Sequence, residues 1–163
     1  MSAAQTLAAF ACELTYERIP ERVAERARTT VIDTVAAAVQ GAALPWSRIV
    51  RDHATSSSAS GHCSMAGSEA RYAAPAAALV NGASAHAFEL DSLIQPSIGV
   101  HPGASLVAPG LAVAQHTEAD GRALLTALVA GCEVMCRIGA ASRHSSERLG
   151  FHAPGLTGVF GAA

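Results

Sequence analysis

The sequence predicts an all-α protein, a bundle-like helical domain that spans residues 1–163. Half of the 163 residues are hydrophobic, whereas aromatic residues make up only 4%. Roughly a quarter of the residues are alanine, which favours helices, and the β-branched and aromatic runs that favour strands are scarce. We therefore expect at least five helices and at most one pair of short strands.

Apolar residues three or four positions apart predict the helices of the first half. The first helix runs from Ala3 to about Arg18. A second runs from Pro20 to Gly41, since proline suits a first helical turn and glycine a helix end. A third begins at Pro45, and the stretch from His62 to Glu69 is expected to form a small extended excursion.

The second half alternates helices with two loops rich in glycine and proline. An alanine-rich segment covers residues 72–87 and is expected to be interrupted at Asn81-Gly82. Helices are predicted from Ala104 to Gln115 and from Gly121 to about Arg143. A last helix is expected to start near Leu156.

Charge and cysteine content exclude several classes of protein. The net charge is −2 and all 11 basic residues are arginine, so the chain offers no basic field for nucleic acid or an anionic membrane, and no lysine chemistry. The longest uncharged apolar runs reach about half of a bilayer span, and the N-terminus lacks the pattern of a secretory signal. The four cysteines are expected to be free thiols, which favours the cytoplasm.

The first loop gathers groups that can transfer protons. His86, Glu89 and Asp91 lie within six positions, and His101 follows in a Val-His-Pro-Gly turn. An imidazole near carboxylates can exchange protons near neutral pH. The alternative, which this segment alone favours, is that the acids cap helices and His86 is a packing histidine. These four residues could also ligate a metal, but they form no compact metal motif, so we expect none.

The second loop carries Arg143, His144, Arg148 and His152. Two guanidinium groups beside a histidine suit a substrate with carboxylates, but for Arg143, His144 and Arg148 the sequence favours a solvated turn between helices. On the preceding helix, Cys132 and Cys136 are one turn apart. No companion Cys/His pair follows them, so packing thiols are expected there rather than a metal site.

Four stretches that cover nearly the whole chain form a recognisable pattern. In order, they read IPERVAERARTTVIDTVAAAVQGA, AALVNGASAHAFELDS, VHPGASLVAPGLAVAQ and ALVAGCEVMCRIGAASR…GFHAPGLTGVFGAA. The combination of an Asn-Gly followed by His-Ala, a His-Pro-Gly turn and a Gly-Phe-His turn is specific. With these motifs the chain resembles the N-terminal helical part of the MmgE/PrpD proteins.

The resemblance implies lyase or isomerase chemistry on small di- or tricarboxylates, without metal or organic cofactor. The family includes 2-methylcitrate dehydratase, cis-aconitate decarboxylase and iminodisuccinate epimerase. It implies a homodimer whose active site lies between a helical domain and a smaller α/β lid. By the resemblance, that site includes Glu89, Asp91, His101 and His152 as catalytic residues, with Arg143 and Arg148 as candidate substrate-binding residues.

Two departures from the family pattern set further expectations. Many relatives have Asp-Phe-Asp-Asp-Thr where this chain has Glu89-Leu90-Asp91-Ser92-Leu93, so the choice of polycarboxylate stays open. Relatives are also much longer, and their catalytic lysine and lid follow the region matched here. We therefore expect a truncated, lid-free domain that is inactive alone. The alternative is a non-catalytic helical interaction module, or half of a split enzyme that dimerises or pairs with a lid-bearing chain.

Overall fold

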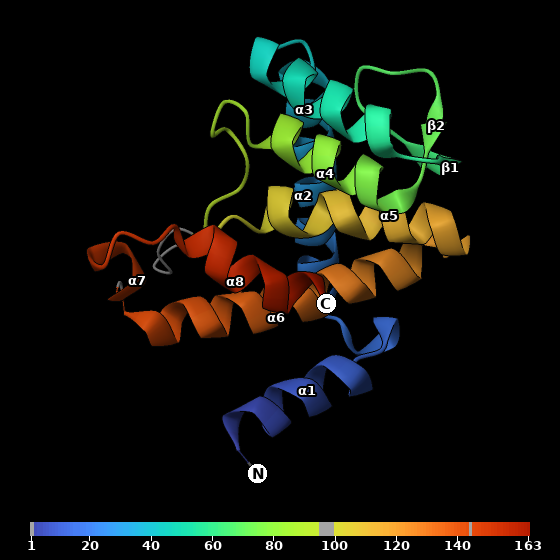
Figure 1. Cartoon of the computed structure of the whole chain (residues 1–163). Coiled ribbons are helices and arrows are strands. Elements are labelled where there is room, and N and C mark those ends of the chain that lie inside the picture. Colours follow the sequence, from blue (N-terminus) through green and yellow to red (C-terminus); the bar gives the residue numbers. More distant parts are fainter. Residues whose placement is uncertain (1, 95–99, 144) are drawn as a thin grey trace.

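Eight α-helices and one two-stranded sheet form the regular structure of residues 2–94, 100–143 and 145–163, the part of the chain that the computed structural model describes (Figure 1). The predicted all-α class is confirmed. The helices are α1 (Ala3–Glu13), α2 (Glu21–Gly41), α3 (Pro45–Ser57), α4 (Ala74–Ala85), α5 (Ala108–Thr117), α6 (Gly121–Ser142), α7 (Ser145–Arg148) and α8 (Ala153–Ala162). Strands β1 (Ser60–Ser64) and β2 (Arg71–Tyr72) pair antiparallel, and short turns of 3-10 and π helix lie at Tyr16–Arg18 and Gly103–Val107.

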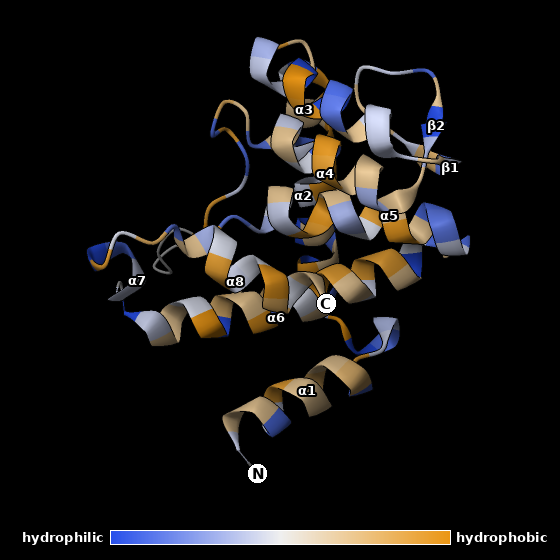
Figure 2. Ribbon diagram, viewed as in Figure 1, coloured by the Kyte–Doolittle hydropathy of each residue, from blue (hydrophilic) through white to orange (hydrophobic). Residues whose placement is uncertain are grey.

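Two groups of helices meet along α2. Helix α4 packs against α2, α3 and α5, and the long α6 packs against α8, α2 and α5 (Figure 1). Apolar residues run along α4, α5, α6 and α8 (Figure 2). Helix α1 lies apart from the others beside α6 and buries none of its residues.

The main hydrophobic core lies between the π-helical turn and α6. Its buried members are Val100, Leu106, Val107, Leu128 and Met135. Burial of such side chains stabilises each by roughly 1.5–3 kcal/mol relative to exposure. The residues just before this turn are therefore anchored, which matters because His101 is one of them.

Helix α6 has the length and apolar composition of a membrane span, with a mean hydropathy of 1.6 over 18 residues. The expectation of no such segment rested on uncharged runs, whereas this window includes charged residues such as Glu133 and Arg137, which form an ion pair. Core helices of globular proteins share this composition. Here α6 contacts four other helices, but only 22% of this window is buried.

The first helix ends earlier than predicted. Leu14 and Thr15 are extended, so α1 stops at Glu13 and only the 3-10 turn Tyr16–Arg18 follows. The β-branched Thr15 favours that extended backbone. The 3–4 spacing of apolar residues ends at Leu14, and Glu17 and Arg18 do not extend it, so the prediction of a helix as far as Arg18 rested on no periodic residue.

The expected interruption at Asn81-Gly82 is wrong, because α4 runs through both residues to Ala85. The Asn81 side chain is used in tertiary contacts instead of a turn. Its Oδ1 accepts a hydrogen bond from the Ala66 N–H at 2.7 Å, and its Nδ2 donates to the Ser64 carbonyl at 2.9 Å. A Cβ at position 82 would make only ordinary van der Waals contact, 3.4 Å from the Ala104 carbonyl oxygen, so packing does not require glycine there.

The helix predicted from Ala104 begins as a π-helical turn and becomes regular only at Ala108. Pro109 lacks the N–H that an α-helix would donate to the carbonyl of Ser105. The backbone widens there by one residue per turn, as π-helical segments inside helices do. The expected extended excursion corresponds to β1 and β2, which bracket residues 65–70.

Candidate active site

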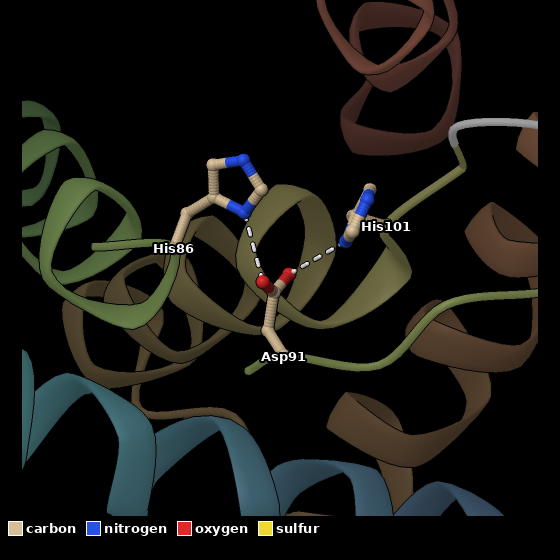
Figure 3. A group of neighbouring side chains, drawn as sticks. All are labelled: His86, Asp91 and His101. Atoms are coloured by element: carbon tan, nitrogen blue, oxygen red, sulfur yellow. Dashed lines mark hydrogen bonds and ion pairs between the residues drawn. The ribbon is translucent and has the colours of Figure 1, made fainter. Parts of the chain in front are cut away.

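Three segments bring His86, Asp91 and His101 together (Figure 3). His86 is the C-terminal cap of α4, and its N–H donates to the Gly82 carbonyl at 3.1 Å. Asp91 lies in the segment that follows α4. His101 lies two residues before the π-helical turn, whose Ser105 N–H donates to the His101 carbonyl. The cluster is therefore built on helix ends, which fix the backbone of two of its three members.

Asp91 lies between the two imidazoles and its side chain is fully buried. Its Oδ1 is 2.8 Å from His86 Nδ1, which is a hydrogen bond, and its Oδ2 is 3.4 Å from His101 Nδ1 (Figure 3). The second pair is close enough for an ion pair, but it lacks hydrogen-bond geometry, so Oδ2 and Nδ1 of His101 are buried without a hydrogen-bond partner. A buried carboxylate needs such partners, because an unpaired charge is costly to bury.

The turn that carries His101 is clamped to the segment after Asp91. The Gly103 N–H donates to Ser92 Oγ at 3.1 Å, and the Ile94 N–H donates to the Val100 carbonyl at 3.2 Å. A Cβ on Gly103 would lie 2.5 Å from Thr34 Oγ1 and 2.9 Å from Ser92 Oγ. Only glycine allows this close approach, which explains the glycine of the His-Pro-Gly turn.

His152 reaches the same cluster from the N-terminal end of α8. Its ring centroid is 6.2 Å from that of His86, and the His86 ring is 4.9 Å from His101 in an edge-on arrangement. Among the described residues no printed contact joins His152 to Asp91 or to His101, so the gathering of His101 and His152 about Asp91 stays a prediction. The connection between the two rings is His86.

His86 is the member of the cluster for which the sequence favoured a packing role. We expected a buried packing histidine, whereas its side chain is 29% exposed and bonded to Asp91. The signal available in the sequence was its position five residues before an acid in a loop, which helix capping explained equally well. Only the end of α4, which points the ring over Asp91, distinguishes the two interpretations.

Glu89 lies at the open side of the cluster. Its Oε1 is 3.9 Å from His86 Nε2 and its side chain is 77% exposed. The residue has φ 52°, a left-handed conformation that is uncommon for a residue with a side chain. This turn, with the Glu89 N–H donating to the His86 carbonyl, reverses the chain so that Asp91 faces inward.

The two arginines lie outside this contact network. Arg143 is an exposed, left-handed cap at the end of α6, and the Arg148 guanidinium donates to the Arg143 carbonyl at 3.2 Å. Among the described residues, neither forms an ion pair with the cluster. His144 lies outside the described residues.

His86, Asp91 and His101 are also a possible set of metal ligands, since their ligand atoms lie within 4.8 Å of one another. Two imidazoles and a carboxylate suit divalent transition metals. The two Nδ1 atoms, however, approach different oxygens of Asp91. The carboxylate therefore lies between the two imidazoles, with one oxygen toward each ring.

A cavity of about 600 Å³ lies elsewhere, between α1, α2 and α6. Its walls are mostly apolar, with Arg18, Arg22 and Arg26 among its lining residues. None of the three cluster residues lines it. The cluster is therefore identified as a candidate site by the contacts among its side chains and not by this cavity.

Residues 5–163 match the MmgE/PrpD N-terminal domain. The chain belongs to the MmgE/PrpD family. It is 32% identical over 137 residues to a cis-aconitate decarboxylase-like protein of Aspergillus oryzae, a match that covers 79% of this chain and 28% of that protein. It is also 32% identical over 138 residues to the cis-aconitate decarboxylase of Aspergillus terreus, covering 81% of this chain and 28% of the relative.

The family match confirms the resemblance found from the four sequence stretches. This MmgE/PrpD domain spans less than a third of the length of these curated relatives. Its His-Asp-His cluster lies inside the matched region, within a single helical unit.

Proposed function

We propose that this MmgE/PrpD domain contributes the histidine-carboxylate part of a lyase site for a small di- or tricarboxylate. The observation that carries the proposal is the buried Asp91 between His86 and His101, with His152 next to His86. Imidazoles oriented by a carboxylate are suited to general acid–base catalysis near neutral pH. The names of the relatives favour decarboxylation of cis-aconitate, with dehydration of 2-methylcitrate as the neighbouring possibility.

In this proposal His101 and His152 are the acid and base, and Asp91 orients an imidazole. Decarboxylation breaks the bond between a carbon and one carboxylate, CO₂ leaves, and the electron pair stays on the carbon skeleton. A protonated imidazole then supplies the proton that this carbon takes up. In dehydration, one imidazole removes a proton next to a carboxylate while the other protonates the departing hydroxyl.

Glu89, Arg143 and Arg148 have weaker roles. Glu89 is at the open side of the cluster, where it could contact substrate beside His86. The exposed arginines are proposed only as candidate carboxylate-binding groups, since no contact joins them to the cluster among the described residues. No resident metal or organic cofactor is proposed.

The test is an assay of CO₂ release from cis-aconitate. We expect the 163-residue chain to be silent alone, because reacting groups must enclose the substrate and exclude water, and to gain activity with a chain that carries the remaining family region. In the active mixture, His101→Ala and His152→Ala should each lower kcat/KM by roughly a hundredfold or more. His116→Ala, which changes an exposed histidine at the end of α5, should leave it unchanged.

Activity that survives both histidine changes would contradict the assignment. Turnover by the chain alone that His101→Ala abolishes would contradict the expected silence and would support the site.

The second candidate is an interaction module that pairs with itself or with a lid-bearing chain. It is favoured by the apolar face of α8, where Leu156, Val159 and Phe160 are exposed. We also propose a cytoplasmic homodimer. The free thiols of Cys12, Cys63, Cys132 and Cys136 support a reducing compartment.

A further inference from the structure

His86 has no role in the chemistry proposed above, yet it makes the best-defined contact in the cluster. Its Nδ1 is 2.8 Å from Asp91 Oδ1, whereas His101 Nδ1 is 3.4 Å from Asp91 Oδ2 without hydrogen-bond geometry. The His86 ring also lies between the two predicted acid–base histidines, 4.9 Å from one and 6.2 Å from the other.

The orientation of the Asp91 carboxylate depends on its hydrogen bonds. The last torsion of an aspartate side chain is broad, so the carboxylate plane has no strong intrinsic preference. Among the described residues, His86 supplies its only side-chain hydrogen bond. With Oδ1 bound to His86, Oδ2 is turned toward His101 Nδ1 (Figure 3).

The direction of Oδ2 decides which nitrogen of His101 carries the proton. A neutral imidazole has one donor nitrogen and one acceptor nitrogen, and a carboxylate facing Nδ1 favours the proton on Nδ1. Nε2 is then free to accept a proton from substrate. Catalytic hydrogen bonds are often long in unliganded sites, so the 3.4 Å separation is compatible with this role.

We propose that His86 is a positioning residue, which acts through Asp91 to hold His101 in its Nδ1–H tautomer. The kinetic part of this inference rests on the proposed function. The tautomer part does not, because it concerns only contacts within this chain.

The tautomer is read directly from the ¹⁵N shifts of the imidazole nitrogens in a labelled 163-residue chain. We expect the Nδ1–H form of His101 to predominate, and His86→Leu to convert it to a tautomer mixture. His86→Asn places an amide N–H at the position of the lost Nδ1 and should preserve the Nδ1–H form. His86→Gln places its N–H one bond farther out and should not.

The Asn and Gln variants keep the test decisive if His86→Leu does not fold, since they differ only in the position of the donor. Asp91→Asn should remove the tautomer preference whatever residue stands at position 86. A His101 tautomer that is the same in the Asn and Gln variants would overturn the proposal. Stoichiometric zinc retained by the purified chain would overturn it too, because the Asp91 oxygens would then be metal ligands.

The kinetic test uses the 163-residue chain mixed with the chain that carries the remaining family region. His86→Gln should lower kcat by about tenfold or more with little change in KM, and should alter the pH profile of kcat, whereas His86→Asn should restore both. Equal kcat values for the two variants would overturn the positioning role. If no lyase activity exists at all, the proposed function fails while the tautomer measurement still decides this inference.

Discussion

At the scale of single residues, the two thiols on α6 show how neighbours change chemical reactivity. The sulfur atoms of Cys132 and Cys136 are 3.8 Å apart, one helical turn from each other. The contact with Cys136 lowers the pKa of Cys132, against the opposing effects of burial and of Glu133. The contact with Cys132, together with burial, raises the pKa of Cys136. The sequence predicted two packing thiols, but the pKa values of these two thiols are shifted in opposite directions.

Iodoacetamide should therefore modify Cys132 before Cys136. The thiolate is the reacting form, and a lowered pKa increases its fraction near pH 8. Cys132 also lines the cavity beside α1, so the reagent has a route to it. Site-resolved mass spectrometry over a time course checks the order, with the exposed Cys12 as reference. Faster labelling of Cys136 would contradict the assigned direction, and Cys132→Ser should make Cys136 more reactive.

At the scale of elements, α6 and α8 are joined by paired glycines. A Cβ on Gly131 would overlap the carbonyl oxygen of Gly161, and a Cβ on Gly161 would lie 2.8 Å from the Gly131 carbonyl and 2.9 Å from Met135 Cβ. Both obstacles include backbone, which cannot move without shifting a helix. The close contact positions α8, whose first residues follow His152.

Gly131→Ala should lower the free energy of unfolding by about 1–3 kcal/mol, because the new methyl group has no space between the helices. The matched control is Gly155→Ala on α8, where nothing lies within 4 Å of the added Cβ. That change should be neutral or stabilise by about 0.4–1 kcal/mol, through lower entropy of the unfolded chain. Urea unfolding measures both. Equal effects of the two substitutions would show that the helices do not approach as described.

At the scale of the whole molecule, many large apolar side chains face solvent. On α8, Val159 is 62% and Phe160 is 56% exposed, and similar residues lie on α2 and α3, among them Ile32, Val39, Trp46 and Ile49. Single exposed apolar residues are ordinary, but groups of them on helix faces mark contact surfaces. Self-association through such faces stays a prediction.

The purified chain should form dimers or larger species whose proportion rises with concentration. Replacing Val159 and Phe160 together with glutamate should shift the population toward monomer, because charged side chains are costly to bury at an interface. Ala162→Glu places a charge on the same helix without removing a large apolar side chain, and should have little effect. Analytical ultracentrifugation over a concentration series checks this. A monomer at every concentration would contradict it.

Local patterns in the sequence were enough to predict the helical class, the approximate helix positions and the family. Alanine content and 3–4 periodicity act within a few residues, and the Gly-Phe-His and His-Pro-Gly turns are contiguous motifs. The same locality explains the errors. The apolar spacing of the first helix ends at Leu14 and gives no signal for the residues up to Arg18, and Asn81-Gly82 is read as a turn unless its contacts with Ser64 and Ala66 are known.

In the candidate site, too, some features were predicted from local sequence motifs and others depend on how the helices pack. From the sequence, the family resemblance predicted that Asp91, His101 and His152 line one site, and that grouping stays a prediction. Only the tertiary structure placed His86 between the imidazoles and buried Asp91 against two of them. The physical reason is that a hydrogen bond depends on distances of tenths of an ångström. Those distances are fixed by how α4, the turn at Gly103 and α8 pack together, and no spacing along the chain encodes them.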